Sequence, residues 1–189
     1  EPKLLLLTGG TDGIFAAGAD IAQLRERGRT DALAAINQGV FARIRALPLP
    51  SVAAIDGPAL GGGAELAYAC DLRVCTARSF FGQPEVRLGI IAGAGATYRL
   101  PALIGEARAK EILFTGRRVD AEEALRIGMV NRVVAEPGEL LPAAHELLDE
   151  IARASFLALR LTKLAVDAPA AAHPQVDRVS QAVLFEDEE

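Results

Sequence analysis

The chain has 189 residues, of which 51% are hydrophobic, and 25 acidic against 20 basic residues give a formal net charge of −5. This length allows one compact domain with a buried core. The mildly acidic balance gives no electrostatic reason to expect nucleic acid or an anionic membrane as the main partner. No stretch resembles a signal peptide, and no uncharged apolar run reaches the ~18 residues of a membrane span. Residues 3–8 read as a strand without a lead-in, so we expect that the natural start is missing.

Cysteine and histidine usage predicts neither a disulfide framework nor a metal site. Cys70 and Cys75 lie five apart in an apolar stretch, and both kinds of site need more partners. We expect buried free thiols in a reducing compartment, and therefore a cytoplasmic protein. His145 and His173 lie far from any cysteine or acidic cluster of ligand spacing, so we expect neither to bind a metal or act in catalysis.

The first half of the chain reads as short strands alternating with helices. Apolar runs predict strands at 3–8, 51–55 and 71–76, with a turn at 56–58. Apolar residues at helical spacing predict one helix from about Asp31 to Leu47, bounded by Pro48. Other expected features are a loop at 9–13, a small-residue segment at 14–21 that leads into a helix, a glycine turn and helix at 61–70, a loop at 80–85, and a helix that opens at 93–97.

The second half reads as mostly helical. Asp120 and Glu123 have the spacing of a helix capping box, and Gly128 fits the end of that helix. Residues 129–134 look like a returning strand, and 139–166 are amphipathic. The pattern predicts an α/β fold, with a core over residues 1–135 that carries the site and a helical region over 136–189.

A glycine run at a helix N-terminus is the first chemical feature. Gly61-Gly62-Gly63 would place free backbone N–H groups where the helix dipole favours negative charge, so it could hold an oxyanion. A turn required only for close helix packing is the alternative, and the run taken alone favours it.

Two glutamates follow. Glu65 would lie in the first turn of the helix among apolar residues. Desolvation there would raise the pKa of its carboxyl group toward neutrality, which would suit it to acid–base catalysis beside an anion site. It could instead only complement the helix dipole. Glu85 is a second candidate, or a solvated loop carboxylate. Two carboxylates could divide a proton addition and a proton removal, but their spacing does not show that they meet.

Several ordered motifs resemble those of the crotonase family, the enoyl-CoA hydratases and isomerases. Residues 14–21 resemble its F-x-A-G-A-D motif, 53–66 its second motif, and 81–89 with 93–100 its third. The T-G-R and A-x-x-x-G-x-V-N signatures are similar to residues 115–117 and 124–131. Because these motifs extend over nearly the whole chain, the resemblance is specific.

The resemblance implies a crotonase-like spiral of ββα units with a C-terminal helical region. It also implies an enoyl-CoA hydratase, which adds water across the 2,3-double bond of a 2-enoyl-CoA to give a 3-hydroxyacyl-CoA. Backbone N–H groups of Ala19 and Gly62 would form the oxyanion hole, and Gly93 would help to hold the catalytic water. Glu65 and Glu85 match the two glutamates of the family's hydratases; we assign Glu65 to water activation and Glu85 to protonation of C2.

The same resemblance implies the ligands and the assembly. Coenzyme A enters as part of the substrate, with no metal or separate cofactor, and the family commonly forms trimers and dimers of trimers. Neither nucleic acid nor a membrane is an expected partner. Four residues could line an acyl pocket or belong to the core: Leu24, Phe80, Ile90 and Ile91. Ala22 departs from a basic residue that many members have near the CoA phosphates, and Ala92 and Ala96 replace a frequent Pro and Gly.

Alternative functions remain open within and beyond the fold. An enoyl-CoA isomerase or another acyl-CoA enzyme of the family is the first, and a non-catalytic or nucleic-acid-binding member is the second. The acidic balance and the two glutamates favour the enzyme. A nucleotide site at Gly93-x-Gly95 lacks a third glycine, and a serine protease lacks a partner motif for either histidine. Acyl chain length and pathway are not specified.

Overall fold

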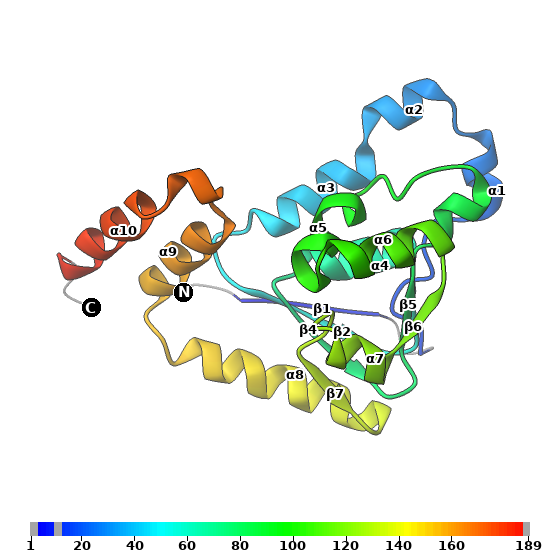
Figure 1. Ribbon diagram of the computed structural model, residues 1–189. Helices are drawn as coiled ribbons and strands as arrows, with labels where there is room; N and C mark the ends of the chain where they lie inside the picture. The colour runs from blue at the N-terminus through cyan, green and yellow to red at the C-terminus, as the bar shows by residue number, and fades with distance from the viewer. Residues whose placement is uncertain (1–3, 10–12, 187–189) are drawn as a thin grey trace.

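The computed structural model describes residues 4–9 and 13–186, so Lys3 of the first predicted strand and residues 10–12 of the predicted loop lie outside it. A parallel sheet in the order β1-β2-β4-β7 forms the centre of the molecule (Figure 1). Its strands are β1 (Leu5–Thr8), β2 (Ser51–Ile55), β4 (Leu72–Thr76) and β7 (Arg132–Val134). All five residues of β2 are buried, as expected of a parallel strand that is covered on both faces.

The two faces of this sheet bury different cores, because successive side chains of a strand point in opposite directions. Val52 and Ala54 pack with Val74 against helix α8 (Pro137–Ala152), whereas Ala53 and Ile55 face a larger core that includes helix α4 (Gly62–Ala69). The predicted α/β class is confirmed, and α4, which carries the glycine run and Glu65, lies directly on the sheet.

A second, three-stranded sheet consists of β3 (Pro58–Leu60), β5 (Phe80–Gly82) and β6 (Arg118–Asp120). The prediction of a loop at 80–85 is wrong, because this segment forms β5 and then enters the 3-10 turn η1 (Pro84–Leu88). Three-residue strands are too short to show a period-2 pattern. The turn predicted at 56–58 ends one residue early, since Pro58 is the first residue of β3, a position that tolerates proline.

The single helix predicted from Asp31 to Leu47 is also wrong. The segment follows α1 (Ile21–Glu26) and forms two helices, α2 (Arg29–Ala34) and α3 (Ile36–Arg45), separated by Ala35 in the left-handed conformation with φ of 48°. Of its apolar stripe only Phe41 is buried, while Leu33 and Ile36 are 74% and 71% exposed. The sequence does contain the apolar stripe, but most of its side chains are exposed to solvent in this chain.

The predicted helix signals at Asp120 and Gly128 and the predicted state of the cysteines are confirmed. Asp120 caps a helix, its Oδ1 accepting the Glu123 N–H at 2.8 Å, and Gly128 follows the helix end with a positive φ. Cys70 and Cys75 are free and buried. No helix within the described part of the chain is long and apolar enough to cross a membrane, and no His, Cys, Asp and Glu cluster there has the form of a metal site. Further helices are α5 (Ala96–Ile104), α6 (Glu106–Thr115), α7 (Ala121–Arg126), η2 (Ala170–Ala172) and α10 (Gln175–Phe185).

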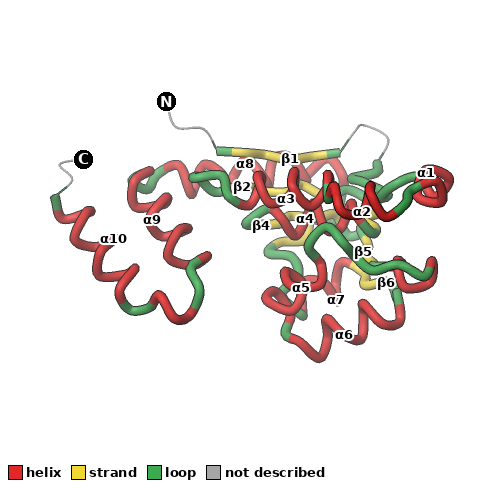
Figure 2. Tube along the Cα trace, turned by 90° about the horizontal axis from the view of Figure 1, so that it is seen from above, coloured by secondary structure: helices red, strands yellow, loops and turns green. Residues whose placement is uncertain are grey.

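The predicted amphipathic segment 139–166 is divided between α8 and α9 (Phe156–Asp167). Ser155 starts α9, since its Oγ accepts the Ala158 N–H at 3.3 Å. Whereas α8 packs on the central sheet, α9 and α10 form a hairpin that extends away from it (Figures 1 and 2).

Candidate active site

The loop that precedes α1 lies against the start of α4. The Leu60 N–H donates to Ala16 O at 3.2 Å, and Ala16 forms an isolated bridge with Ala59 of β3. Gly63 packs so closely that an added Cβ would lie 1.9 Å from Ala16 O. At Gly18 an added Cβ would lie 3.7 Å from the Gly62 nitrogen, so residues 16–19 and the first turn of α4 are immediate neighbours.

This junction carries the two predicted oxyanion donors. Gly62 is the first residue of α4, where backbone N–H groups have no intrahelical partner. Within the described residues, neither the Ala19 nor the Gly62 N–H donates to a protein acceptor. Two free N–H groups beside a helix N-terminus can bind a carbonyl oxygen that gains negative charge, although their role here stays a prediction.

Glu65 lies in the first turn of α4 and is 3% exposed. Its Oε1 accepts two backbone hydrogen bonds, from the Ala94 N–H at 2.8 Å and the Ala96 N–H at 3.0 Å. No donor to its Oε2 is found among the described residues. The carboxylate is therefore anchored through one oxygen, while the other can accept a proton.

Sequence reasoning missed the backbone donors of Ala94 and Ala96. Backbone contacts leave no side-chain signature, and the only signal is the glycine-rich turn Gly93 to Gly95 that opens α5. Gly93, predicted to position water, is exposed and directly precedes Ala94, one of the two backbone donors to Glu65. The structure does not test its role.

Glu85, in η1, is half-buried and turns toward the same space. The pKa of Glu85 is raised to about 7, mainly because the carboxyl group is buried; the Glu85 backbone N–H opposes this rise, and the charge of the nearby Glu65 carboxylate adds to it. At Gly61, with φ of 53°, an added Cβ would lie 2.9 Å from Glu85 Oε1. The positive φ favours glycine at this position, and the short distance shows that Glu85 reaches the start of α4. The structure thus brings the two predicted carboxylates together.

The buried amide of Gln83 donates hydrogen bonds to Glu85, and sequence reasoning missed this contact. Gln83 is 1% exposed, and its Nε2 donates to Glu85 Oε2 at 3.0 Å and Oε1 at 3.1 Å in the orientation that satisfies both ends of the amide. The only signal in the sequence is that Gln83 precedes Glu85 by two residues.

The four predicted acyl-pocket residues have different surroundings. Ile90 and Ile91 are 43% and 72% exposed, so neither belongs to the core. The Ile90 N–H donates to Glu85 O at 3.2 Å, which places its backbone beside the site. Leu24 is half-buried in α1, and the half-buried Phe80 packs under the Arg118 guanidinium, 4.5 Å from the ring centre. The structure does not show these four side chains in one pocket.

Comparison with known proteins identifies the family. Residues 2–188 match the family described as enoyl-CoA hydratase/isomerase. The chain belongs to the enoyl-CoA hydratase/isomerase family. This family member is 46% identical over 167 residues to the crotonyl-CoA hydratase of Syntrophomonas wolfei, and 42% identical over 169 residues to the short-chain-enoyl-CoA hydratase of Clostridium acetobutylicum.

These alignments cover 87% and 88% of the chain but 64% of each relative, so this family member spans less than two thirds of their length. A crystal structure of enoyl-CoA hydratase from Bacillus anthracis superposes with a TM-score of 0.91 at 35% identity, covering 98% of this chain and 74% of that one. The predicted family and the predicted crotonase-like fold are both confirmed.

Proposed function

We propose that this chain is the catalytic part of an enoyl-CoA hydratase, which adds water across the 2,3-double bond of a 2-enoyl-CoA to give a 3-hydroxyacyl-CoA. The pairing of two carboxylates in one small space carries the proposal: Glu65 is anchored by two backbone N–H groups, and Glu85 has its pKa raised to about 7. Such a pair suits one proton removal and one proton addition at neutral pH. The hydratase names of two relatives support the same chemistry.

The thioester must first be made electrophilic. Conjugation with the carbonyl places partial positive charge on C3, and attack there moves electrons toward the carbonyl oxygen. In this proposal the Ala19 and Gly62 N–H groups donate to that oxygen and stabilise the enolate-like transition state. Fixed backbone donors need no reorganisation during the reaction, which is why they suit this role.

The two glutamates then handle the protons. Glu65 Oε2 accepts a proton from water as the water oxygen forms a bond to C3. The carboxylic acid of Glu85 donates its proton to C2, and the C2–C3 double bond becomes a single bond. Each cycle leaves Glu65 protonated and Glu85 ionised, and one net proton transfer between them restores the starting state. Gly93, which directly precedes the backbone donor Ala94, is the proposed backbone contact for the water.

Coenzyme A enters as part of the substrate, and the proposed chemistry uses no metal or separate cofactor, because two carboxylates and two backbone donors supply every group that it needs. We propose a cytoplasmic protein, which fits the buried free thiols of Cys70 and Cys75. Leu24, Phe80, Ile90 and Ile91 remain proposed contacts of the acyl chain.

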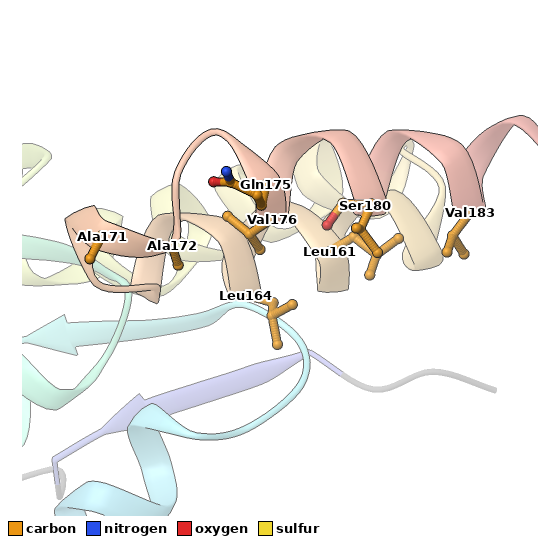
Figure 3. A pocket seen from close by; sticks show the side chains of 9 residues that line it. Leu161, Leu164, Ala171, Ala172, Gln175, Val176, Ser180 and Val183 are labelled. Carbon is orange, nitrogen blue, oxygen red and sulfur yellow. The ribbon is translucent and has the colours of Figure 1, made fainter.

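We propose a homotrimer or a dimer of trimers, supported by the uncovered apolar surface of the α9–α10 hairpin. Side chains from both helices line a cavity of about 490 Å³, among them Leu161, Leu164 and Val176 (Figure 3). Leu164 and Val179 are 59% and 65% exposed in the single chain. Exposed apolar patches of this kind mark protein contacts. Light scattering coupled to size exclusion measures the assembly, and a monomer at micromolar concentration would contradict it.

Replacing each glutamate by glutamine tests the proposed reaction. Glutamine keeps the size of the side chain but exchanges no proton, so Glu65→Gln and Glu85→Gln should each lower kcat by about 10²–10⁴ with a small change in KM. The double variant should lose far less than the product of the two losses, because the residues act as a unit.

The assay follows loss of the conjugated-thioester absorbance of crotonyl-CoA, and it also scores the double-bond shift of a 3-enoyl-CoA. Glu106→Gln, an exposed carboxylate paired with Lys110, is the matched control and should retain wild-type kcat. Full hydration by either single variant would exclude the two-glutamate mechanism. Loss of isomerisation in one variant alone would favour an isomerase.

A further inference from the structure

The α9–α10 hairpin takes no part in the hydrophobic core of the described chain. Neither helix contributes a residue to the apolar clusters of the described residues, or to the half-buried side chains packed against those clusters. No residue of α9 is buried, and Ser180 is the one buried residue of α10. The hairpin also extends away from the central sheet (Figures 1 and 2). Apolar packing in the core therefore does not determine where the hairpin lies.

Polar contacts join α9 to the body of the molecule, which is the two sheets with helices α1 to α8. The side chain of Lys163, within α9, is 10% exposed, and its Nζ donates to Asp71 Oδ2 at 2.7 Å and to Leu49 O at 3.2 Å. Asp167, the last residue of α9, pairs with Arg45 at the end of α3. Arg45 Nη1 donates in turn to Asp71 Oδ1 at 2.8 Å. Both ionic contacts of α9 thus lead to one carboxylate.

The Asp71 carboxylate is itself fixed to the central sheet. The backbone N–H and the hydroxyl of Ser51, the first residue of β2, both donate to its Oδ2 at 2.8 Å, and the Asp71 N–H donates back to Ser51 Oγ at 3.0 Å. The Asp71 side chain is 17% exposed, so its ion pairs are partly shielded from water. Charge-assisted hydrogen bonds are stronger than neutral ones, and shielded pairs are less screened by salt than exposed pairs.

We propose that Asp71 anchors the α9–α10 hairpin on the body, and that its contacts with Lys163 and Arg45 set the direction in which the apolar surface of the hairpin faces. Hydrogen bonds and ion pairs are directional, so they select one orientation where apolar contact alone would allow several. The surface that includes Leu164 and Val179 is thereby presented for contact with a second copy of the chain. This consequence rests on the proposed assembly, whereas the anchor itself does not.

Lys163→Met is the main test, because methionine keeps an unbranched stem and removes the charge. Spin labels at Gln181→Cys on α10 and Ala107→Cys on α6, both exposed, report the distance between hairpin and body. Cys70 and Cys75 are buried and stay unlabelled in the folded protein. Labelled chains are diluted with an excess of unlabelled protein, so that each assembly carries one labelled chain.

Pulsed electron paramagnetic resonance should give one narrow distance distribution for the labelled wild-type background. In Lys163→Met the fraction of hairpins at other distances should rise about tenfold, the effect of losing one hydrogen bond between charged groups. Asp71→Asn should increase that fraction at least as much, since both ionic contacts of α9 lead to Asp71. Adding Lys163→Met to Asp71→Asn should then cause little further change, because the two residues act in one contact.

Glu150→Gln is the matched control. Glu150 forms an ion pair with Arg132 at 2.8 Å, but it belongs to α8, which packs on the central sheet. Its loss should leave the distance distribution unchanged. A wild-type distribution in folded Lys163→Met overturns the proposal, and so does equal broadening in Glu150→Gln. If Asp71→Asn does not fold, Lys163→Met decides the matter alone.

Light scattering of the same variants tests the consequence for assembly. The protein concentration at which half of the assembly dissociates should rise about tenfold in Lys163→Met and stay unchanged in Glu150→Gln. A monomeric wild-type protein would end the proposed assembly, while the spin-label distances still decide whether Asp71 anchors the hairpin. An assembly of wild-type strength in Lys163→Met with a displaced hairpin would refute the link between the anchor and the assembly surface.

Discussion

Gly63→Ala tests whether the oxyanion site depends on contact between residues 16–19 and α4. The added Cβ would lie 1.9 Å from Ala16 O and 2.6 Å from Ala16 C, whereas ordinary contacts begin at 3.4 Å. Both neighbours are backbone atoms, so no side-chain rotation relieves the overlap and the two segments must separate by about 1.5 Å.

That separation would pull the Ala19 N–H away from the Gly62 N–H. A misplacement of about 1 Å at a reacting centre costs about 10²-fold, and loss of one oxyanion donor costs about 10²–10³ in kcat. We therefore expect Gly63→Ala to lower kcat for crotonyl-CoA hydration by about 10²–10³. Overpacking of this kind should also lower the free energy of unfolding by about 1–3 kcal/mol.

Steady-state kinetics and urea unfolding measure the two effects separately. Gly39→Ala is the control: Gly39 lies inside α3, and an added Cβ meets no atom within 4 Å. That change should leave kcat unaltered and stabilise the helix by about 0.5–1 kcal/mol. Wild-type kcat in a folded Gly63→Ala protein would refute the reasoning and place the oxyanion donors elsewhere.

Two further predictions concern stability. The buried Arg73 side chain donates to the carbonyl oxygens of Met129 and Cys70, each at 2.7 Å, so Arg73→Met should lower the free energy of unfolding by at least about 3 kcal/mol; a urea midpoint like the wild type's would contradict this. The pKa of Glu85 is raised from 4.5 to about 7, so its stabilising contribution is complete below about pH 4.5 and is lost as the pH rises through 7. Glu85→Gln should reduce the decline in stability between pH 5 and 8, relative to the wild type, in urea unfolding at both pH values.

The sequence allowed prediction of those features that are set by local chemistry. Strand β2 lies where its apolar run predicts, and the Asp120 cap begins α7 as its spacing predicts. Glu65 was recognisable because it follows a glycine run that opens a helix, and Glu85 because its motif resembles the family's. Each of these signals lies within a few consecutive residues.

The missed parts of the site depend on contacts between distant segments. The N–H groups of Ala94 and Ala96 reach Glu65 across about thirty residues, and any residue type except proline could supply them. The contact of the buried Gln83 amide with Glu85 is equally invisible, since nothing in the sequence marks this glutamine as buried. Recognition of a family located the catalytic candidates, but only the structure showed what surrounds them.

The wrongly predicted helix at 31–47 allows a last test. A continuous helix and a break at Ala35 predict changes of opposite sign in the stability of Ala35→Gly. Inside a continuous helix, Ala35→Gly would destabilise the protein by about 1 kcal/mol. The structure instead places Ala35 at φ of 48°, between α2 and α3, where an L-residue with a Cβ is strained by about 1–2 kcal/mol and glycine is not. Ala35→Gly should therefore stabilise the protein by about 1 kcal/mol in urea unfolding, while Ala42→Gly, exposed within α3, should destabilise it by a similar amount. If both changes destabilise equally, residues 29–45 form one helix and the break at Ala35 is refuted.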